Sequence, residues 1–290
     1  MAARAVHVRI EHDAIDSYAT RLGEPRLSLG GGLRATAERE ELAAYWLTLN
    51  AINFGSGWFP TLRKRFAPTG YRTIAGGLRR RFEDVGPWSA DELVEIRVEE
   101  LADVFDQDPE HPLLALFAAS LRDLGRRIGG RGSFAAAADS AGGSAATLVT
   151  ELARWDCFAD SSRYGAITVP FLKRAQIAAA DLHRAGAVEL YDLEALTMFA
   201  DNLVPHVLRL DGVLRFEPEL VAAIERGELL AHGSPAEVEI RACAVRAVEL
   251  LVAACPAPTC AAAVDELLWN RGQLPRYKAR PRHRSRTTAY

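Results

Sequence analysis

The sequence predicts a mainly α-helical protein that forms a single compact domain, and three observations carry this prediction. Apolar residues recur at intervals of three and four along most of the 290-residue chain. Period-two alternation, which indicates strands, is confined to two short stretches, 6–10 and 166–169. The composition is that of an ordinary globular protein, with 49% hydrophobic and 25% charged residues, so the chain can bury a sizeable core.

The helical pattern is clearest over residues 37–52, where one stripe holds Leu42, Tyr45, Trp46, Leu49 and Ile52. Residues 113–128 repeat it with Leu113, Leu116, Phe117, Ser120, Leu121 and Leu124. By the same periodicity we expect further helices over 169–185, 192–200, 203–210, 218–226, 235–254 and 260–270.

Residues 129–147 are rich in Gly, Ala and Ser, which is typical of a flexible loop or a loose helix. We therefore expect this segment to join an N-terminal lobe, residues 1–128, to a C-terminal lobe, residues 148–290. Both lobes would belong to the one domain that spans 1–290.

The charge and the cysteines narrow the class of protein. With 35 Lys and Arg against 38 Asp and Glu, the formal net charge is −3, which argues against a general nucleic-acid coat protein. The N-terminus has no continuous apolar core, and no uncharged stretch combines membrane-spanning length with strong hydrophobicity. The four cysteines lack the spacing of a zinc or redox motif. We expect a cytoplasmic protein with reduced thiols.

The segment 53–60 follows the first strong helix and holds three large rings, Phe54, Trp58 and Phe59. Its two glycines, Gly55 and Gly57, allow backbone conformations that are closed to other residues. A loop of this kind either plugs the core or forms a stacking slot for a flat ligand, and the sequence pattern favours the plug.

The segment 169–182 is apolar around most of a helical circumference and is therefore expected to be buried. Its polar exceptions are Lys173, Arg174, Gln176 and Asp181. A buried cation needs a carboxylate or phosphate partner, which means either a structural ion pair or a ligand. The structural pair, or a lysine that reaches solvent, is the simpler interpretation.

The segment 197–206 contains the end of one expected helix and the start of the next. Asp201 can cap the second helix, with Pro205 tolerated in its first turn. A carboxylate there, close to Phe199, can also face a ligand pocket and stabilise a developing cation. From the residues alone, the cap is favoured.

Other charges are less informative. A solvated helix face explains Glu237, Glu239 and Arg241 in one expected helix, and Asp265 with Trp269 in another. The tail 276–286 is basic and has no acidic residue, so it is either a disordered tail, which composition favours, or a strap that binds phosphate.

Taken together, these segments resemble the queuosine salvage proteins, which are queuosine 5′-phosphate N-glycosylase/hydrolases. The most specific pieces are FLKRAQIAAADL (171–182) and TMFADNLVP (197–205), followed by VEIR (238–241) and the terminal HRSRTTAY (283–290). Weaker matches extend from YWLTLNAINF (45–54) to DELLW (265–269). Each piece alone is weak, but their order along one chain is hard to obtain by chance.

The resemblance implies cleavage of the N-glycosidic bond of queuosine 5′-monophosphate, with release of queuine for tRNA modification. It implies no metal, no cofactor and a helical fold similar to helix-hairpin-helix DNA glycosylases. The expected partner is the small nucleotide substrate. We expect a monomer, no membrane association and no stable nucleic-acid complex.

The resemblance also assigns residues. Asp201 matches the family's acidic residue and takes the catalytic carboxylate role, with Lys173 in support and Phe199 stacked on the base. The expected substrate-binding positions are Asn53, Phe54, Asp160, Tyr164, Arg174, His283, Arg284 and Arg286, and Tyr290 matches the end of the family's basic terminus. Lys173, Arg174 and the terminal arginines are the phosphate candidates. Asp160, Glu237 or Glu239 is the expected partner of the ammonium on queuine.

Three departures lie near the expected pocket, and one is the Gly-Ser-Gly-Trp stretch at 55–58, which differs from the forms of eukaryotic members. Asn202 and Leu203 stand where many members have Tyr-Arg, and His206 stands where a Gln is common. These changes bear on substrate preference more than on reaction class. Two other classes remain open: a base glycosylase that acts on DNA or RNA, and a non-catalytic helical nucleotide-binding module.

Overall fold

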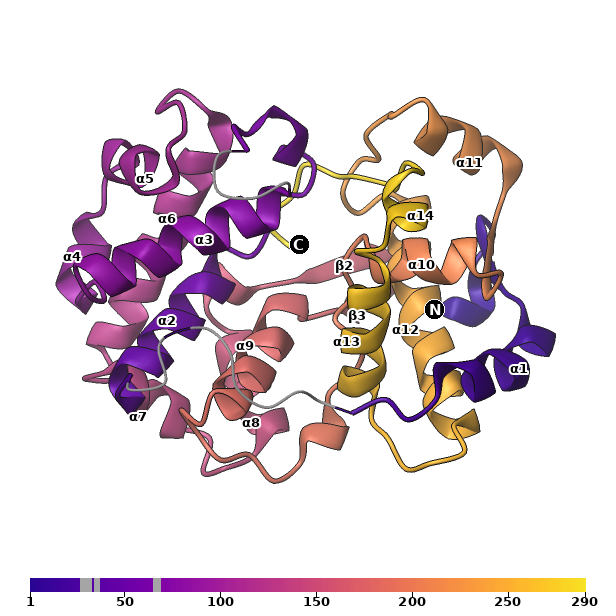
Figure 1. Ribbon diagram of the computed structural model, residues 1–290, viewed down its shortest axis with the longest axis horizontal. Helices are drawn as coiled ribbons and strands as arrows, with labels where there is room; N and C mark the ends of the chain where they lie inside the picture. The colour runs from indigo at the N-terminus through magenta and orange to yellow at the C-terminus, as the bar shows by residue number, and fades with distance from the viewer. Residues whose placement is uncertain (27–32, 34–36, 65–68) are drawn as a thin grey trace.

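The protein is built from helices, with two small antiparallel strand pairs. The computed structural model describes residues 1–26, 33, 37–64 and 69–290. Figure 1 shows two groups of helices, one on each side of a central region. The first group holds α2 (Arg39–Ala51), α3 (Gly70–Asp84), α4 (Ala90–Glu95), α5 (Val98–Phe105), α6 (Pro112–Gly129), α7 (Phe134–Asp139), α8 (Ala145–Leu152) and α9 (Lys173–Arg184). The second holds α1 (His12–Leu22), α10 (Val204–Leu210), α11 (Pro218–Glu225), α12 (Pro235–Ala254), α13 (Ala261–Arg271) and α14 (Pro275–Lys278).

Both strand pairs are short and antiparallel. In the first, β1 (Val8–Ile10) pairs with β4 (Leu214–Phe216) with Val8 opposite Phe216. In the second, β2 (Ser161–Tyr164) and β3 (Ile167–Pro170) form a hairpin. The two stretches predicted as strands, 6–10 and 166–169, are thus confirmed, and so is the mainly helical class. In the described residues no helix is both long and apolar enough to cross a bilayer.

Two hydrophobic clusters form the core. One is built from residues between 43 and 196, and the other joins 8–22 and Phe171 to residues between 198 and 277. The chain therefore passes from one cluster to the other near residue 197, not within the predicted joint 129–147. The reason is that α7 and α8 pack with α2 and α9, which places the whole region 129–152 in the first cluster.

The segment 129–147, for which a flexible loop or a loose helix was expected, is made of short helices and the turns between them. It contains the end of α6, all of α7 and the start of α8. Ser133 and Ser144 accept hydrogen bonds from the backbone N–H of Ala136 and Thr147 and so cap α7 and α8. Ala137 and Ala138 are buried in the first cluster. Small residues here allow close packing of short helices.

The segment 192–200, predicted as a helix, is instead a 3₁₀ turn, Leu193–Ala195, followed by extended chain. Side chains from two helices replace the missing helical bonds. Gln176 on α9 accepts from the N–H of Thr197 at 2.7 Å, and Asp265 on α13 accepts from the N–H of Phe199 at 3.0 Å. Because these contacts come from distant parts of the chain, local periodicity does not reveal them.

The other predicted helices lie where expected to within a few residues, with one difference at α9. Residues 169–170 belong to β3, and α9 begins only at Lys173.

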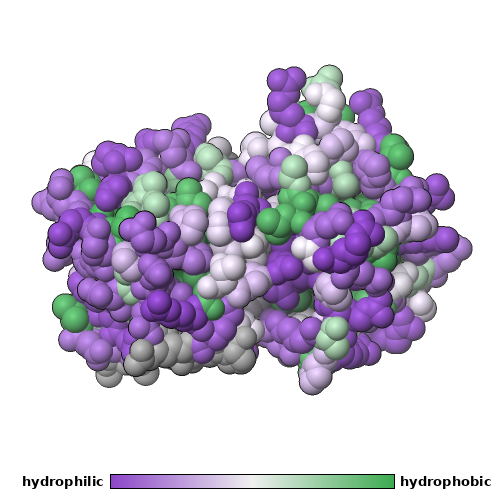
Figure 2. Space-filling view, turned by 90° about the horizontal axis from the view of Figure 1, so that it is seen from above, coloured by the Kyte–Doolittle hydropathy of each residue, from purple (hydrophilic) through white to green (hydrophobic). Residues whose placement is uncertain are grey.

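In the view from above, polar side chains cover most of the surface and the two halves meet along a central seam (Figure 2).

Candidate active site

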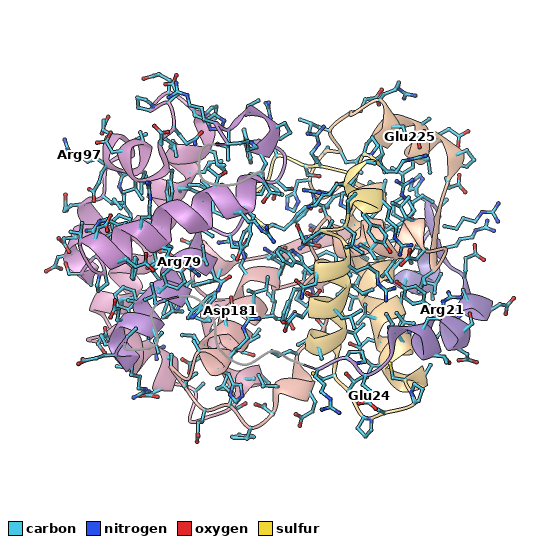
Figure 3. All side chains as sticks on the ribbon, in the orientation of Figure 1. Arg21, Glu24, Arg79, Arg97, Asp181 and Glu225 are labelled. Carbon is cyan, nitrogen blue, oxygen red and sulfur yellow. The ribbon has the colours of Figure 1, made fainter. Side chains whose placement is uncertain are left out.

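A cavity of about 650 Å³ is lined by elements of both halves of the molecule. Helix α9 contributes residues spaced by three and four, which share one face: Lys173, Ile177, Ala180, Asp181 and Arg184. Helix α13 supplies Ala262, Asp265, Glu266, Trp269 and Asn270. The extended segment around Asp201 and the chain after α14 complete the lining. Figure 3 shows side chains of the two halves converging on this central region.

Asp201 lies where the extended segment meets α10. Its Oδ1 accepts hydrogen bonds from the backbone N–H of Leu203 and Val204 at 2.8 and 3.0 Å. Helix α10 begins at Val204 with Pro205 in its first turn, and its N-cap residue is Leu203 and not Asp201 as predicted; Asp201 instead binds the N–H groups at the start of the helix from two positions before the N-cap. Oδ2 makes no hydrogen bond with the described part of the chain, and the carboxylate lines the cavity. One side chain therefore both binds two backbone N–H groups at the start of α10 and faces the cavity.

Lys173 is the first residue of α9, and both its backbone N–H and its side-chain Nζ donate hydrogen bonds. Its backbone N–H donates to Asp160 Oδ2 at 3.0 Å, and its Nζ donates to the carbonyl oxygen of Asn53 at 2.9 Å. The residue before it, Leu172, has a left-handed backbone with φ of 52°, which is strained for a side chain of this size. The hydrogen bond from the Leu172 N–H to the Asp160 carbonyl, at 3.1 Å, helps to maintain this conformation.

Burial lowers the pKa of Lys173 to about 8, while the negative charges of Asp201, Asp160 and Asp265 oppose that shift. An ammonium group with a pKa in this range is stabilised by the carboxylates around it. The lysine is therefore a desolvated cation in a mainly acidic centre.

Asp265 completes this centre from α13. It is 4% exposed, and burial, with the charge of Asp201 as the next cause, raises the pKa of the Asp265 carboxyl well above its ordinary value. Its Oδ1 accepts the N–H of Phe199, which fixes Phe199 at the cavity wall. Two carboxyl groups with different environments therefore face one lysine, an arrangement suited to acid–base chemistry.

The chain after α14 crosses from one half of the molecule toward the other and ends between them (Figure 1). We call residues 281–290 the C-terminal strap. Burial alternates along it: His283, Ser285, Thr287 and Ala289 are buried, whereas Arg282 and Arg284 line the cavity. This is the side-chain alternation of an extended chain. Lys64, Lys278 and Arg280 also line the cavity.

Three contacts hold the strap in place. The Asn202 amide donates to the His283 carbonyl at 3.1 Å, the Leu230 N–H donates to the Arg284 carbonyl at 2.9 Å, and the Gly55 N–H donates to the Tyr290 carbonyl at 3.0 Å. The strap is thus packed into the fold and is not the disordered tail that composition favoured.

The structure brings about half of the predicted site residues together. Those that line the cavity are Asn53, Phe54, Lys173, Phe199, Asp201 and Arg284, and Tyr290 lines it as well. The ring of Phe54 also packs edge-on against Phe117 in the core, so the loop after α2 both plugs the core and touches the cavity. Those that do not line it are Asp160, Tyr164, Arg174, His283 and Arg286.

Hydrogen bonds elsewhere in the fold explain why most of these residues do not face the cavity. Arg174 donates to the carbonyl oxygens of Ala51 and Cys157, and Tyr164 donates to Glu239 at 2.7 Å. Arg286 is exposed and lies over the Trp58 ring.

Asp160 is committed to Arg241. The guanidinium donates to both carboxylate oxygens, at 3.0 and 2.6 Å, and neither side chain has exposed surface. Asp160 therefore does not face the cavity, contrary to its expected place beside the substrate ammonium.

The other two expected ammonium partners are also buried elsewhere. Glu239 accepts the backbone N–H groups of Val6, His7 and Val8, at 2.9, 2.5 and 3.2 Å. Glu237 accepts the N–H of Gly233 at 3.0 Å. Both are fully buried, so the solvated helix face that we expected for them is wrong.

Sequence reasoning did not select several cavity residues as substrate contacts: Tyr71, Asp181, Asp265, Glu266 and Trp269. Asp181 and Asp265 had a weak signal, since each is an acid in an otherwise apolar helical stretch. Tyr71 and Trp269 meet edge-on across the cavity wall, with ring centroids 5.8 Å apart. No local pattern links these residues, which are far apart along the chain.

The chain is similar to proteins of one family. A family model described as "Queuosine salvage protein" matches residues 33–290. The chain is 37% identical to a queuosine 5′-phosphate N-glycosylase/hydrolase of Sphaerobacter thermophilus, over 99% of this chain and 94% of that protein. Proteins of the same name from Nematostella vectensis and Mus musculus are 34% and 30% identical, over 62% and 63% of this chain and 55% and 57% of theirs.

Proposed function

The chain belongs to the queuosine salvage protein family, and we propose that it hydrolyses the N-glycosidic bond of queuosine 5′-monophosphate and releases queuine. One observation carries the proposal beyond the family: a single cavity holds the carboxylate of Asp201, the desolvated Lys173 and the carboxyl of Asp265 at its centre, with several cations beside them. This arrangement suits a nucleotide whose sugar carbon becomes positively charged during cleavage.

The cations of the strap provide the proposed phosphate site. Arg282 and Arg284 reach the cavity together with Lys278, and a guanidinium can bind two phosphate oxygens at once. Arg282 and Lys278 also interact electrostatically with Asp201. A phosphate bound there would place the attached ribose next to the Asp201 carboxylate.

Asp201 then acts on the ribose. Cleavage of an N-glycosidic bond develops positive charge at the anomeric carbon, and a fixed carboxylate stabilises that charge. The two backbone N–H groups that Oδ1 accepts hold the carboxylate rigidly, which leaves Oδ2 for the substrate. Water supplies the hydroxyl group that ends on the sugar, and the bonding electrons leave with the base.

A proton assists departure of the base because it neutralises the leaving group. A 7-deazaguanine has carbon in place of N7, where purines are usually protonated, so the proton must reach an edge that carries O6 or N3. Asp265 is the proposed donor. A carboxyl whose pKa is raised by burial keeps its proton to a higher pH than an exposed aspartate. Lys173 offers a further hydrogen-bond donor in the same centre, and Phe199 is the proposed stacking ring.

We also propose that the protein works as a cytoplasmic monomer on a free nucleotide, without a stable nucleic-acid complex. The likeness to helix-hairpin-helix DNA glycosylases remains a proposal about the fold, supported by the mainly helical architecture.

The test is release of queuine from queuosine 5′-monophosphate by purified protein, compared with the Asp201→Asn variant. The side-chain oxygen of Asn can accept the same two backbone N–H groups as Asp201 Oδ1, so the variant keeps these bonds while it removes the charge. We expect wild-type turnover, with a loss of about 10²- to 10³-fold in the variant. No release by the wild type would contradict the reaction, whereas equal release by both proteins would remove Asp201 from the chemistry.

A further inference from the structure

A second pocket, of about 460 Å³, lies outside the cavity of Asp201 and carries three arginines. We call it the arginine pocket. Helix α1, the end of α10 and the junction of α13 with α14 supply its lining residues, which are Tyr18, Arg21, Asp211, Arg271, Leu274 and Arg276. None of them lines the cavity.

The junction between α13 and α14 separates the arginine pocket from the cavity. Asn270 and Gln273 line the cavity, whereas Arg271 and Leu274 line the arginine pocket. Neighbouring residues on a helix point about 100° apart, so the two sites face different sides of the same helix end. In Figure 3, Arg21 lies on the outer side of the second group of helices, away from the centre of the molecule.

The arginine pocket holds more positive charge than its one acid neutralises. Asp211 is its only carboxylate, and it pairs with Arg271 at 3.4 Å and with Arg276 at 3.5 Å. Arg21 contacts the ring of Tyr18, 5.5 Å from its centroid, and has no carboxylate partner in the described part of the chain. The remaining residues of the sequence include no Asp or Glu. Three guanidinium groups and one carboxylate leave two positive charges in one pocket.

Asp211 orients these arginines and does not fill the pocket with negative charge. Its Oδ1 accepts the Tyr277 hydroxyl at 2.8 Å and its Oδ2 accepts the Tyr18 hydroxyl at 2.6 Å, and the carboxylate is 12% exposed. Burial, with the hydrogen bond to Asp211 as the next cause, raises the pKa of both tyrosines, so both hydroxyls stay protonated and donate. The Tyr18 hydroxyl also accepts from Arg271 at 3.0 Å, which fixes that guanidinium.

A phosphate group is the anion that this arrangement suits. Guanidinium groups match the oxygens of a phosphate, and a pocket lined by like charges attracts an anion. The whole chain has a net charge of −3, so the excess of positive charge here is local. A volume of about 460 Å³ is that of a small-molecule site and exceeds what a bare phosphate needs. Leu274, which is 50% exposed, gives an apolar wall for an attached group.

We infer that the arginine pocket is a second binding site for a phosphate group, carried by inorganic phosphate or by a small phosphate monoester. Arg21 and Arg276 make the main contacts, because both are exposed and Arg21 has no other charged partner. Arg271 stays anchored to Tyr18 and Asp211 and gives the site its fixed cation. The inference does not depend on the proposed function, since none of these residues takes part in the proposed reaction.

The experiment is a calorimetric titration of inorganic phosphate into the full chain carrying Arg282→Met and Arg284→Met, which remove the proposed phosphate contacts of the cavity. Sodium chloride keeps the ionic strength constant. We expect saturable binding, which Arg21→Gln together with Arg276→Gln weakens about 10- to 100-fold, the effect of losing charge-assisted contacts. No saturable binding before these two substitutions, or unchanged affinity after them, would overturn the inference.

Arg97→Gln together with Arg154→Gln is the matched control. Both arginines are exposed and lie outside the two pockets, so this pair removes the same charge from elsewhere on the surface. It should leave the phosphate affinity within about 3-fold. An equal loss in the control would mean a general effect of charge and would contradict a site. Should the Arg21 and Arg276 pair not fold, Arg21→Gln alone removes no hydrogen bond and should still weaken binding about 10-fold.

Ribose 5-phosphate in the same titration distinguishes the two sources of the phosphate group. Tighter binding than inorganic phosphate indicates a monoester, equal binding indicates the phosphate group alone, and both must weaken with Arg21→Gln for the site to stand. The reaction and this site can fail separately. With the strap intact, the Arg21 and Arg276 substitutions should leave release of queuine unchanged, whereas a wild type that releases no queuine contradicts the reaction and not the site.

Discussion

Arg241 and Asp160 form a two-point ion pair with no exposed surface, in which Nη1 and Nη2 donate to Oδ1 and Oδ2 at 3.0 and 2.6 Å. The guanidinium is stacked between the rings of Phe171 and Tyr290, 3.9 and 4.6 Å from their centroids. Its Nε donates at 2.9 Å to the carbonyl of Ala200, the residue before Asp201. Because Asp160 also accepts the backbone N–H of Lys173, the pair connects both central residues of the cavity.

We predict that Asp160→Asn destabilises the protein by about 3 to 5 kcal/mol, since it removes the carboxylate that the buried guanidinium binds at two points. Only Glu237, 3.8 Å from Arg241 Nη1, then remains as a buried carboxylate beside it. Denaturant unfolding measures this loss. Glu225→Gln breaks the exposed pair with Arg280 and should change stability little. A loss for Asp160→Asn no larger than for this control would contradict the prediction.

We predict that Lys173→Met is more stable than wild type at neutral pH but far less active. The folded-state pKa of Lys173, about 8, lies below the ordinary value of 10.5. Between these values the unfolded chain binds more protons, so wild-type stability should rise with pH in this window, by up to about 3 kcal/mol relative to the variant. Unfolding measured from pH 7 to 10.5 on both proteins tests this sign.

The lowered pKa of Lys173 also predicts that the catalytic rate depends on pH near 8. If the ammonium form of Lys173 takes part, kcat/KM of the wild type falls as the pH rises through about 8. Lys173→Arg stays charged over this range and should move this fall to higher pH. If the pH profiles of kcat/KM of the two proteins coincide above pH 8, the charge of Lys173 takes no part in the reaction.

We predict that Arg282→Met weakens the nucleotide far more than the nucleoside. Loss of a charge-assisted contact to phosphate should raise KM for the 5′-monophosphate about 10- to 100-fold. Turnover of the free nucleoside should be much less affected. Arg286→Met is the control, because Arg286 lies on the same strap but outside the cavity. An equal effect of the two variants would rule out a phosphate contact by Arg282.

Gly57→Ala is predicted to displace the strap. A Cβ atom at Gly57 would lie 2.4 Å from the backbone oxygen of Ser285, so the loop and the strap must separate. We expect a raised KM for the monophosphate with a helical content that is unchanged by circular dichroism. Gly130→Ala meets only ordinary contacts, at 3.6 Å or more, and should behave as wild type. Unchanged KM in Gly57→Ala would mean that the strap does not position the phosphate.

Periodicity was sufficient wherever a helix buries one clear face. Residues 235–254 were predicted with the bounds that α12 has, and 37–52 and 113–128 lie within two residues of α2 and α6. In contrast, 192–200 carries a helical pattern but is largely extended, because Gln176 and Asp265 bind its backbone. The spacing of apolar residues in this segment therefore reflects the burial of their side chains, not a helical backbone.

The sequence by itself determined the helical class, the order of motifs that identifies the family, and the choice of Asp201 and Lys173 as candidates. Only the tertiary structure decided which polar residues face the cavity. Asp160 and Asp265 are both acids near apolar residues, yet one is committed to a buried Arg241 and the other lines the cavity. The physical reason is that a local pattern reports how much of a residue is buried, whereas its partner comes from a distant part of the chain.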